Sequence, residues 1–255
     1  MQVGRIVESA RARASARGRQ RAKRREQELV GRLEGNLISR LVEMLAVDVV
    51  VDVGANRGQT VQWFRHAGFR GDIVSFEPTS EAYAELVRRC ASDDRWTGHR
   101  MALGATSGRL EINRYEQDVF SSFLSPSSFG KQRFDALTST AVERETVQVE
   151  RLDAVWSELV PEGVALLKID TQGFDLEVLR GAGDKLLTVA VVQLEAPVTS
   201  IYDGMPTLQE LVTFLAERGF EPAGFFPVTR DRHLLRLVEA NCLFVRTDLL
   251  DALGT

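Results

Sequence analysis

Residues 49–60 read VVVDVGANRGQT, and this stretch decides the fold. It begins with β-branched apolar residues, which favour a strand buried on both faces, and it ends with residues that suit the start of a helix. Between them, Gly54 and Gly58 let the chain bend sharply and let a ligand or a strand come close, because neither carries a Cβ. We therefore predict a strand, a ligand-binding turn and a helix of a nucleotide-binding α/β sheet, with the ligand at the carboxyl edge of the strands.

The turn differs from the fingerprint of dinucleotide-binding proteins. That fingerprint is Gly-x-Gly-x-x-Gly, and counting from Gly54 this chain has Asn56 and Gln59 where the second and third glycines would stand. Asp52 lies at the end of the strand, where a carboxylate repels a diphosphate and attracts a cation. We therefore expect S-adenosylmethionine, which carries an ammonium and a sulfonium but no phosphate, in preference to a nicotinamide dinucleotide.

A second apolar strand, residues 73–76, also ends in an acid, Glu77. Glu77 follows Gly54 by about twenty residues, which is the spacing at which a carboxylate accepts hydrogen bonds from the hydroxyls of a ribose. Methyl-donor sites and nicotinamide sites share this feature. It therefore supports a bound nucleoside without choosing between the two.

Four segments together resemble a known family. They are VDVGANRGQT (51–60), FEP (76–78), KIDTQGFD (168–175) and QLE (193–195). Each segment alone is a weak signal, but the four in this order and spacing resemble the signature of FkbM-type methyltransferases. The resemblance covers about residues 48 to 246. It implies a class I methyltransferase fold: a doubly wound, mostly parallel seven-stranded sheet of order 3-2-1-4-5-7-6 with an antiparallel last strand and helices on both faces. We also predict a helical amino-terminal extension before this sheet. The residues by themselves indicate only a doubly wound α/β domain.

The resemblance also implies roles for the residues at the first two strand ends. Gly54 and Gly58 would shape the pocket for the methionine part of S-adenosylmethionine, and Asp52 would lie near its amine, directly or through water. Glu77 would bind the ribose. Asn56 would fix the turn or the carboxylate of the donor.

Further donor contacts are expected beyond the second strand. We predict a third strand over residues 98–103, and in the proteins that this region resembles the loop after that strand borders the adenine, so Ala102 and Leu103 are candidate contacts. Residues 115–140 are rich in Ser and Phe. A long loop of this kind is either a lid or binding loop, or a surface excursion. Its Ser-Ser pair resembles a family feature, so Ser122 is a weaker candidate.

The chemistry is predicted at the end of the strand over residues 164–169. Lys168 and Asp170 are two residues apart and share one face of an extended strand. Asp170 could therefore reach a substrate hydroxyl as the base, while Lys168 either stabilises the developing oxyanion or orients Asp170. Two alternatives remain: the pair only braces the strand end, or Asp170 contacts the donor and Glu195 is the base. Because Glu77, Asp170 and Glu195 all end strands of one sheet, they should converge on one cleft.

The resemblance implies methyl transfer to a hydroxyl of a sugar, a glycolipid or a natural product. A methyltransferase-like fold kept as a binding or scaffold module is the alternative from another class, and a nicotinamide-dependent oxidoreductase is a weaker one. Cys90 and Cys242 lie far apart, and no His, Cys and carboxylate residues have metal-site spacing, so we expect no metal and a reducing, cytoplasmic location.

Charged residues are distributed unevenly along the 255-residue chain. Residues 1–32 hold ten Lys and Arg against three Glu, and the remainder holds 22 against 33, so the two parts carry formal charges of +7 and −11. The acidic part disfavours nucleic-acid binding. We predict a basic arm over residues 1–28, helical or disordered, and a methyltransferase domain over 29–255, where a leucine stripe begins. The arm is a solvated tail, a contact to anionic lipid or an acidic partner, or a presequence.

Overall fold

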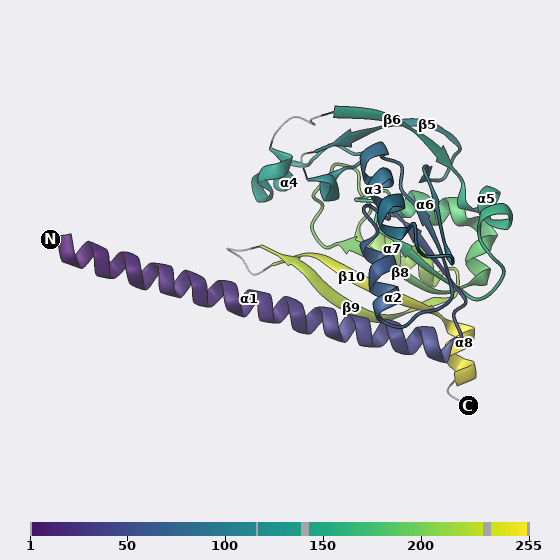
Figure 1. Cartoon of the computed structure of the whole chain (residues 1–255), viewed down its shortest axis with the longest axis horizontal. Helices are drawn as coiled ribbons and strands as arrows, with labels where there is room; N and C mark the ends of the chain where they lie inside the picture. Colours follow the sequence, from purple (N-terminus) through teal and green to yellow (C-terminus); the bar gives the residue numbers. More distant parts are fainter. Residues whose placement is uncertain (1, 116, 139–142, 232–235, 254–255) are drawn as a thin grey trace. The chain divides into compact units, whose positions relative to one another are not determined.

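The computed structural model describes residues 2–115, 117–138, 143–231 and 236–253 (Figure 1). The chain divides into two compact units, residues 1–40 and 41–255. A single helix, α1 (Gln2–Met44), forms the first unit and runs into the second, so the predicted helical extension is confirmed. The helix continues through the predicted arm boundary between residues 28 and 29. None of the helices in the described ranges is both long and apolar enough to cross a membrane.

The second unit is built on a seven-stranded sheet of order β3-β2-β1-β7-β8-β10-β9. Its strands are β1 (Val49–Val53), β2 (Asp72–Phe76), β3 (Trp96–His99), β7 (Ala165–Ile169), β8 (Val189–Pro197), β9 (Phe220–Arg230) and β10 (Leu237–Arg246). Only β10 runs antiparallel to its neighbours, β8 and β9, and the other pairs are parallel. The strand order and the antiparallel last strand are therefore as predicted.

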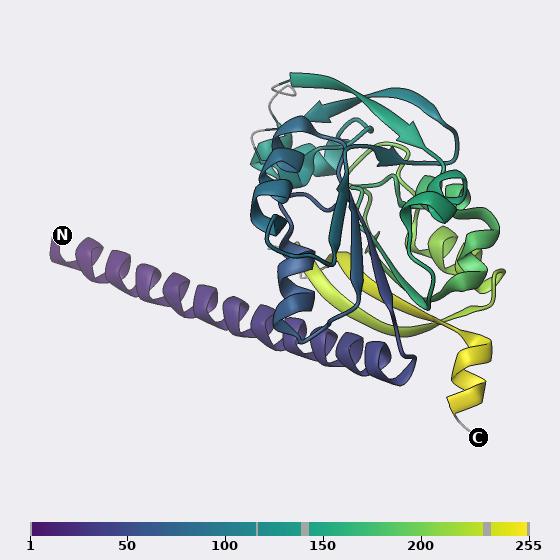
Figure 2. The ribbon, with the colours of Figure 1, turned by 45° about the vertical axis from the view of Figure 1, so that its right-hand side comes forward.

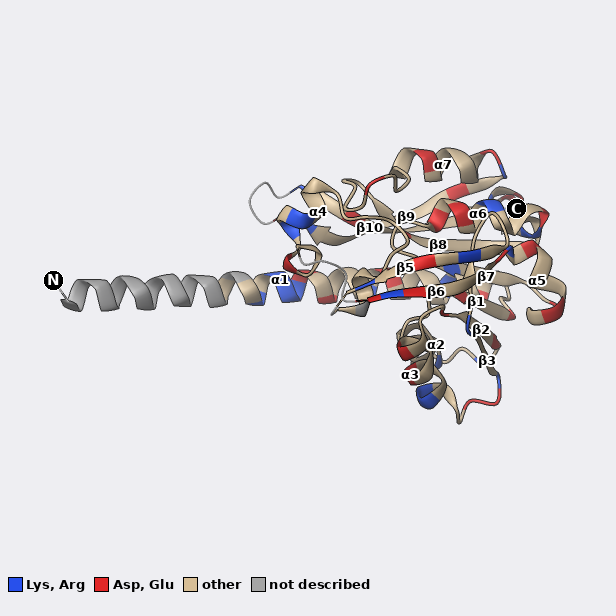
Figure 3. Cartoon of the chain, turned by 90° about the horizontal axis from the view of Figure 1, so that it is seen from above, with Lys and Arg blue, Asp and Glu red and all other residues tan. Residues whose placement is uncertain are grey.

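Helices cover both faces of this sheet. They are α2 (Gln59–His66), α3 (Ser80–Cys90), α5 (Leu152–Leu159), α6 (Asp175–Ala182) and α7 (Leu208–Ala216), with α8 (Thr247–Leu253) at the end of the chain. Figure 3 shows α2 and α3 on one side of the strands and α5, α6 and α7 on the other. At the start of α7, Thr207 and Glu210 form the capping box that their spacing predicts, because each side chain accepts the other residue's backbone N–H.

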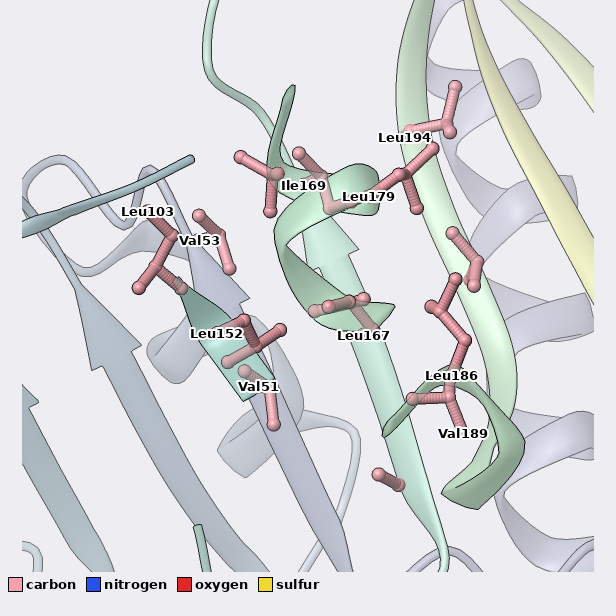
Figure 4. Packing of buried hydrophobic residues seen from close by; sticks show 14 of the residues in the cluster. Val51, Val53, Leu103, Leu152, Leu167, Ile169, Leu179, Leu186, Val189 and Leu194 are labelled. Carbon is pink, nitrogen blue, oxygen red and sulfur yellow. The ribbon is translucent and has the colours of Figure 1, made fainter. Parts of the chain in front are cut away.

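The main core lies between the sheet and the second group of helices. Alternate residues of the central strands face it, among them Val51, Val53 and Leu167, and they pack against Leu152 of α5 and Leu179 of α6 (Figure 4). All five β1 residues are buried, because helices cover both faces of that strand. This burial explains why every residue of the strand except Asp52 is apolar.

A second sheet of three strands, order β4-β6-β5, lies beyond the carboxyl ends of the main strands (Figure 2). Its strands are β4 (Ala102–Leu103), β5 (Gly108–Arg114) and β6 (Glu143–Glu150). The single strand predicted over residues 98–103 is therefore wrong. β3 ends at His99, and Ala102–Leu103 pairs with β6 in the other sheet. Local apolar content marks both pieces as strands but carries no information about which partner each one takes.

The long connection between β5 and β6 is more ordered than a structureless loop. It contains the short helix α4 (Ser128–Arg133) and the 3₁₀ turns η1 (Asp118–Phe120) and η2 (Asp135–Leu137). Several of its apolar residues belong to a small separate core, in which Tyr115 and Leu137 join Tyr202 and Val238. The hydroxyl of Tyr202 also donates a hydrogen bond to the carbonyl oxygen of Phe120, at 2.8 Å.

Candidate functional site

A cavity of about 360 Å³ opens at the carboxyl ends of β1, β2 and β7, within the size range of small-molecule sites. Parts of both sheets and of the β5–β6 connection line it. Of the predicted site residues, the cavity lining includes Gly54, Asn56, Glu77, Ala102, Leu103, Lys168, Asp170 and Glu195. The acids predicted at three strand ends thus lie around one cavity.

The glycine turn brings two strand ends together at the floor of this cavity. Gly54 has a φ of +78°, and a Cβ at this position would lie 2.0 Å from the carbonyl oxygen of Asp170. Only glycine therefore lets the end of β7 pass this close to the end of β1. Gly58 also has a positive φ, +85°, but a Cβ there would meet the side chains of Leu86 and Cys90 at 3.0 and 3.2 Å. The absence of a Cβ at Gly58 thus lets the glycine turn pack closely against Leu86 and Cys90 of α3.

Glu77 is held by a set of short hydrogen bonds. Its side chain accepts the backbone N–H of Asn56 at 2.9 Å, the backbone N–H of Thr79 at 2.9 Å and the hydroxyl of Thr79 at 2.6 Å. Burial raises the pKa of Glu77, and these hydrogen bonds oppose the shift. The carboxyl group is therefore fixed in orientation at the cavity wall.

A row of polar side chains crosses the sheet beneath the cavity. Asp52 on β1 pairs in register with Lys168 on β7, and Lys168 pairs with Gln193 on β8, so the three side chains share one face. The Nζ of Lys168 lies 3.2 Å from Asp52 and 3.6 Å from Asp170. Asp52 is fully buried and does not line the cavity itself.

This arrangement determines the charge of Lys168. Burial alone would lower the pKa of Lys168, but the carboxylates of Asp52 and Asp170 raise it above its ordinary value. Burial raises the pKa of Asp52, and Lys168 partly offsets that effect. Lys168 therefore stays a cation that orients Asp170. The ion pair predicted as a possible brace of the strand end is present, and Lys168 and Asp170 both also line the cavity.

Further carboxyl groups lie around Asp170 and Glu195. Burial, followed by the carboxylates of Asp170 and Glu239, raises the pKa of Glu195 well above its ordinary value. Glu239 on β10 pairs in register with Pro197, two residues beyond Glu195, so it lies on the same face. Glu239 was not predicted from the sequence, because an acid inside a late strand has no motif, and only the register of β8 and β10 brings it to Glu195.

Ser122 lies next to the cavity lining, in a structural position. It is fully buried, its hydroxyl donates to the carbonyl oxygen of Gln172 at 2.7 Å, and its Oγ accepts the backbone N–H of Leu124 at 3.1 Å. Its neighbours Ser121 and Phe123 line the cavity instead. Ser122 thus fastens the β5–β6 connection to the turn after β7.

Two cavity residues that were not predicted from the sequence lie in or directly after its motifs. Thr79 follows Phe-Glu-Pro, and Gln172 lies in the segment of residues 168–175. Gln172 donates a hydrogen bond from Nε2 to Asp170 at 3.2 Å. Both residues lie within two positions of a predicted acid, and this proximity is the signal that could have found them.

The residues around the cavity fit S-adenosylmethionine. The carboxyl group of Glu77 is held by backbone and side-chain hydrogen bonds at the cavity wall, and Asp170 and Glu195 add the acids that a cationic donor requires. Among the described residues, Ser121 Oγ and Thr171 Oγ1 are buried at the cavity without a hydrogen-bond partner, so a polar ligand would satisfy them. The sheet order and this cavity together are the arrangement expected of an S-adenosylmethionine-dependent methyltransferase.

Comparison with known proteins establishes the family. The model of the methyltransferase FkbM domain matches residues 52–222, which is more than half of the chain. The chain therefore belongs to the FkbM methyltransferase family, and the resemblance found in its sequence is confirmed. S-adenosylmethionine is accordingly its cofactor.

Two curated relatives and one solved structure show how far the similarity extends. Methyltransferase sdnD of Sordaria araneosa is 28% identical over 208 residues, covering 72% of this chain and 75% of the relative. The 2-O-methyltransferase NoeI of Sinorhizobium fredii (strain NBRC 101917 / NGR234) is 25% identical over 190 residues, covering 70% of this chain and 74% of the relative. Fibrillarin of Aeropyrum pernix, solved with bound S-adenosyl-L-methionine, is 13% identical with a TM-score of 0.46, covering 84% of this chain and 74% of that one.

Proposed function

We propose that this methyltransferase acts on oxygen, transferring the methyl group to a hydroxyl of a sugar, a glycolipid or a natural product. The observation that carries the proposal is the placement of Asp170 in the donor cavity, held between Lys168 and Gln172. A hydroxyl must lose its proton as it accepts a methyl group, so a positioned carboxylate is the group that such a reaction needs. The relative named as a 2-O-methyltransferase supports methylation of oxygen.

Each residue of the site has a distinct task in this reaction. S-adenosylmethionine supplies a methyl group on a sulfonium, which transfers by in-line displacement. Glu77 and the glycine turn bind the donor, and Asp170 accepts the proton of the acceptor hydroxyl. Lys168 holds Asp170 in place and compensates the buried charge of Asp52. Alignment of donor and acceptor then contributes much of the rate.

Glu195 has a supporting task. Burial and the nearby carboxylates of Asp170 and Glu239 raise its pKa, which favours the neutral carboxyl form. A neutral carboxyl can donate a hydrogen bond, so Glu195 would orient the acceptor while Asp170 accepts the proton. If Glu195 were the base instead, Asp170→Asn would keep a large part of the turnover.

The test combines donor binding with turnover. Calorimetry with S-adenosylmethionine, S-adenosylhomocysteine and NAD should give heat with the two sulfur ligands alone. Incubation of the protein with labelled donor and a cell extract should add one methyl group to an acceptor, identified by mass. Asp170→Asn should keep donor affinity within several-fold and abolish transfer, and Asp184→Asn, an exposed carboxylate in η3 (Gly183–Thr188), is the matched control.

Each other outcome has a definite meaning. Donor binding without transfer to any compound would leave a binding module in place of an enzyme. No binding of either sulfur ligand would refute the donor site. An equal loss of binding and transfer in Asp170→Asn would move Asp170 from base to donor ligand.

We further propose that the basic arm brings the domain to an anionic membrane surface, where a lipid-linked acceptor would lie. Its described cations, among them Arg21, Lys23, Arg24 and Arg25, are exposed on α1. Each basic residue near an anionic bilayer contributes about 1 kcal/mol of attraction. Several together are enough for reversible binding at low ionic strength.

A further inference from the structure

A cluster of ion pairs joins the second sheet to the start of α3. At its centre Arg114, on β5, lies 2.7 Å from Glu81, 2.9 Å from Glu143 and 3.8 Å from Glu145. The side chains of Arg114 and Glu145 are 14% and 13% exposed, whereas those of Glu81 and Glu143 are 60% and 63% exposed. Arg114 is therefore a largely buried cation that bridges two outer carboxylates and one inner carboxylate, and a network around one shared cation contributes more than isolated surface pairs do.

The cluster extends to the two segments that carry the donor contacts. Glu145 accepts the backbone N–H of Ser80 at 2.9 Å, and Ser80 directly follows the segment of Glu77 and Thr79. Glu81 also pairs with Arg57 at 3.3 Å, and Arg57 lies inside the glycine turn. Arg114 and Glu145 thus connect β5 and β6 to both sides of the donor cavity.

The same strands cover the cavity. Ile112 lines it and lies two residues before Arg114, so both side chains are on one face of β5. Ile112 also pairs in register with Glu145, and Arg114 with Glu143. Figure 3 shows the charged segments of β5 and β6 side by side. Movement of the second sheet away from α3 would therefore uncover the donor.

Charge balance makes this connection depend on Arg114. Three cations, Arg57, Arg100 and Arg114, face three carboxylates, Glu81, Glu143 and Glu145; Arg100 pairs with Glu145 at 3.1 Å. Without Arg114, Glu81 on α3 and the two carboxylates on β6 lose their shared cation. The remaining negative charges then repel one another across the junction between the second sheet and α3.

We propose that Arg114, with Glu145, is a positioning residue for the donor: it holds the second sheet over the cavity and so controls how long the bound nucleoside stays. The proposal rests on the proposed donor site, which it deepens. Neither Arg114 nor Glu145 lines the cavity. Their effect is therefore transmitted through the covering strands and the segment of residues 77–80.

The test measures release of S-adenosylhomocysteine from the full-length protein by stopped-flow displacement. In Arg114→Gln the dissociation rate should rise between about 3-fold and 30-fold, the range for residues that act without touching the ligand, while the association rate changes little. Arg114→Lys should restore part of the slow release, because lysine keeps the positive charge but lacks the several N–H donors with which a guanidinium group binds two carboxylates at once. A loss of overall stability alone would leave the dissociation rate unchanged at a temperature far below unfolding, because every variant is then fully folded.

The chain offers a matched control on the other face of the same sheet. Arg144 pairs with Glu111 at 3.7 Å, and both side chains are well exposed, at 69% and 62%. Arg144→Gln should leave the dissociation rate unchanged. Should Arg114→Gln fail to fold, Glu81→Gln is the second variant, because its side chain is 60% exposed and it should speed release in the same direction.

Unchanged release in Arg114→Gln, or in Glu81→Gln where the first does not fold, overturns the proposal. An equal acceleration in Arg144→Gln overturns it as well, since the effect would then be general to the sheet. Failure of the donor site itself is distinguishable from these results. In that case the unaltered protein would not bind S-adenosylhomocysteine at all.

Discussion

Replacing Gly54 with alanine tests whether two strand ends meet at the glycine turn. The new Cβ would lie 2.0 Å from the Asp170 carbonyl oxygen and 2.8 Å from its carbonyl carbon, whereas ordinary contacts begin at 3.4 Å. The backbone at Asp170, directly after β7, would have to move by more than an ångström to restore an ordinary contact. It cannot rotate away as a side chain could, because its strand is paired on both sides.

The cost has two parts, which a second glycine separates. A positive φ costs a non-glycine residue about 1–2 kcal/mol, and forcing atoms into a packed site typically costs about 1–3 kcal/mol more. Gly68 has a φ of +92°, and a Cβ there would have nothing within 4 Å, so Gly68→Ala reports the first part alone. Gly54→Ala should therefore lower the free energy of unfolding by about 2–5 kcal/mol, and Gly68→Ala by about 1–2 kcal/mol.

Urea denaturation measures both values, and calorimetry with S-adenosylhomocysteine measures the consequence for the site. Displacing Asp170 and Thr171 distorts the cavity wall, so Gly54→Ala should weaken binding by about tenfold or more, equivalent to about 1.4 kcal/mol. Gly68→Ala should bind as the unaltered protein does. Equal destabilisation by the two substitutions, with binding intact in both, would refute the close approach at Gly54.

Two further predictions concern a buried acid and the arm. Burial, then the charge of Asp170, raises the pKa of Asp175 from 3.8 to about 7. The native state then keeps a proton between about pH 4 and pH 7 that the unfolded chain has released, so the free energy of unfolding falls as pH rises through that window. Asp175→Asn should flatten this slope in urea denaturation from pH 5 to pH 8, and curves parallel to those of the unaltered protein would contradict the assignment. Deleting residues 1–28 should leave the melting temperature within about 2 °C, less than the shift for 1 kcal/mol, and abolish sedimentation with phosphatidylserine vesicles. A large fall in melting temperature would show that the arm packs on the domain.

Several features of the site could be predicted from local sequence. The β-branched run before Gly54 favours a buried strand. The glycines after it favour a tight turn into a helix. Glu77 and Asp170 were found because acids that end apolar strands all reach the same sheet edge. The capping box at Thr207 is local as well, because both of its partners lie within one helical turn. The order of the seven strands came from the resemblance to the FkbM family.

Only the tertiary structure decided which distant residues meet. The pairing of Asp52 with Lys168 and the position of Glu239 beside Glu195 depend on the register of neighbouring strands, and the contacts of Arg114 with α3 depend on a second sheet that was not predicted from the sequence. Periodicity along a chain indicates which face of a helix or strand is buried. It does not indicate which strands pair with one another, because paired strands are far apart in sequence and the free energy of their pairing depends on the whole packed fold.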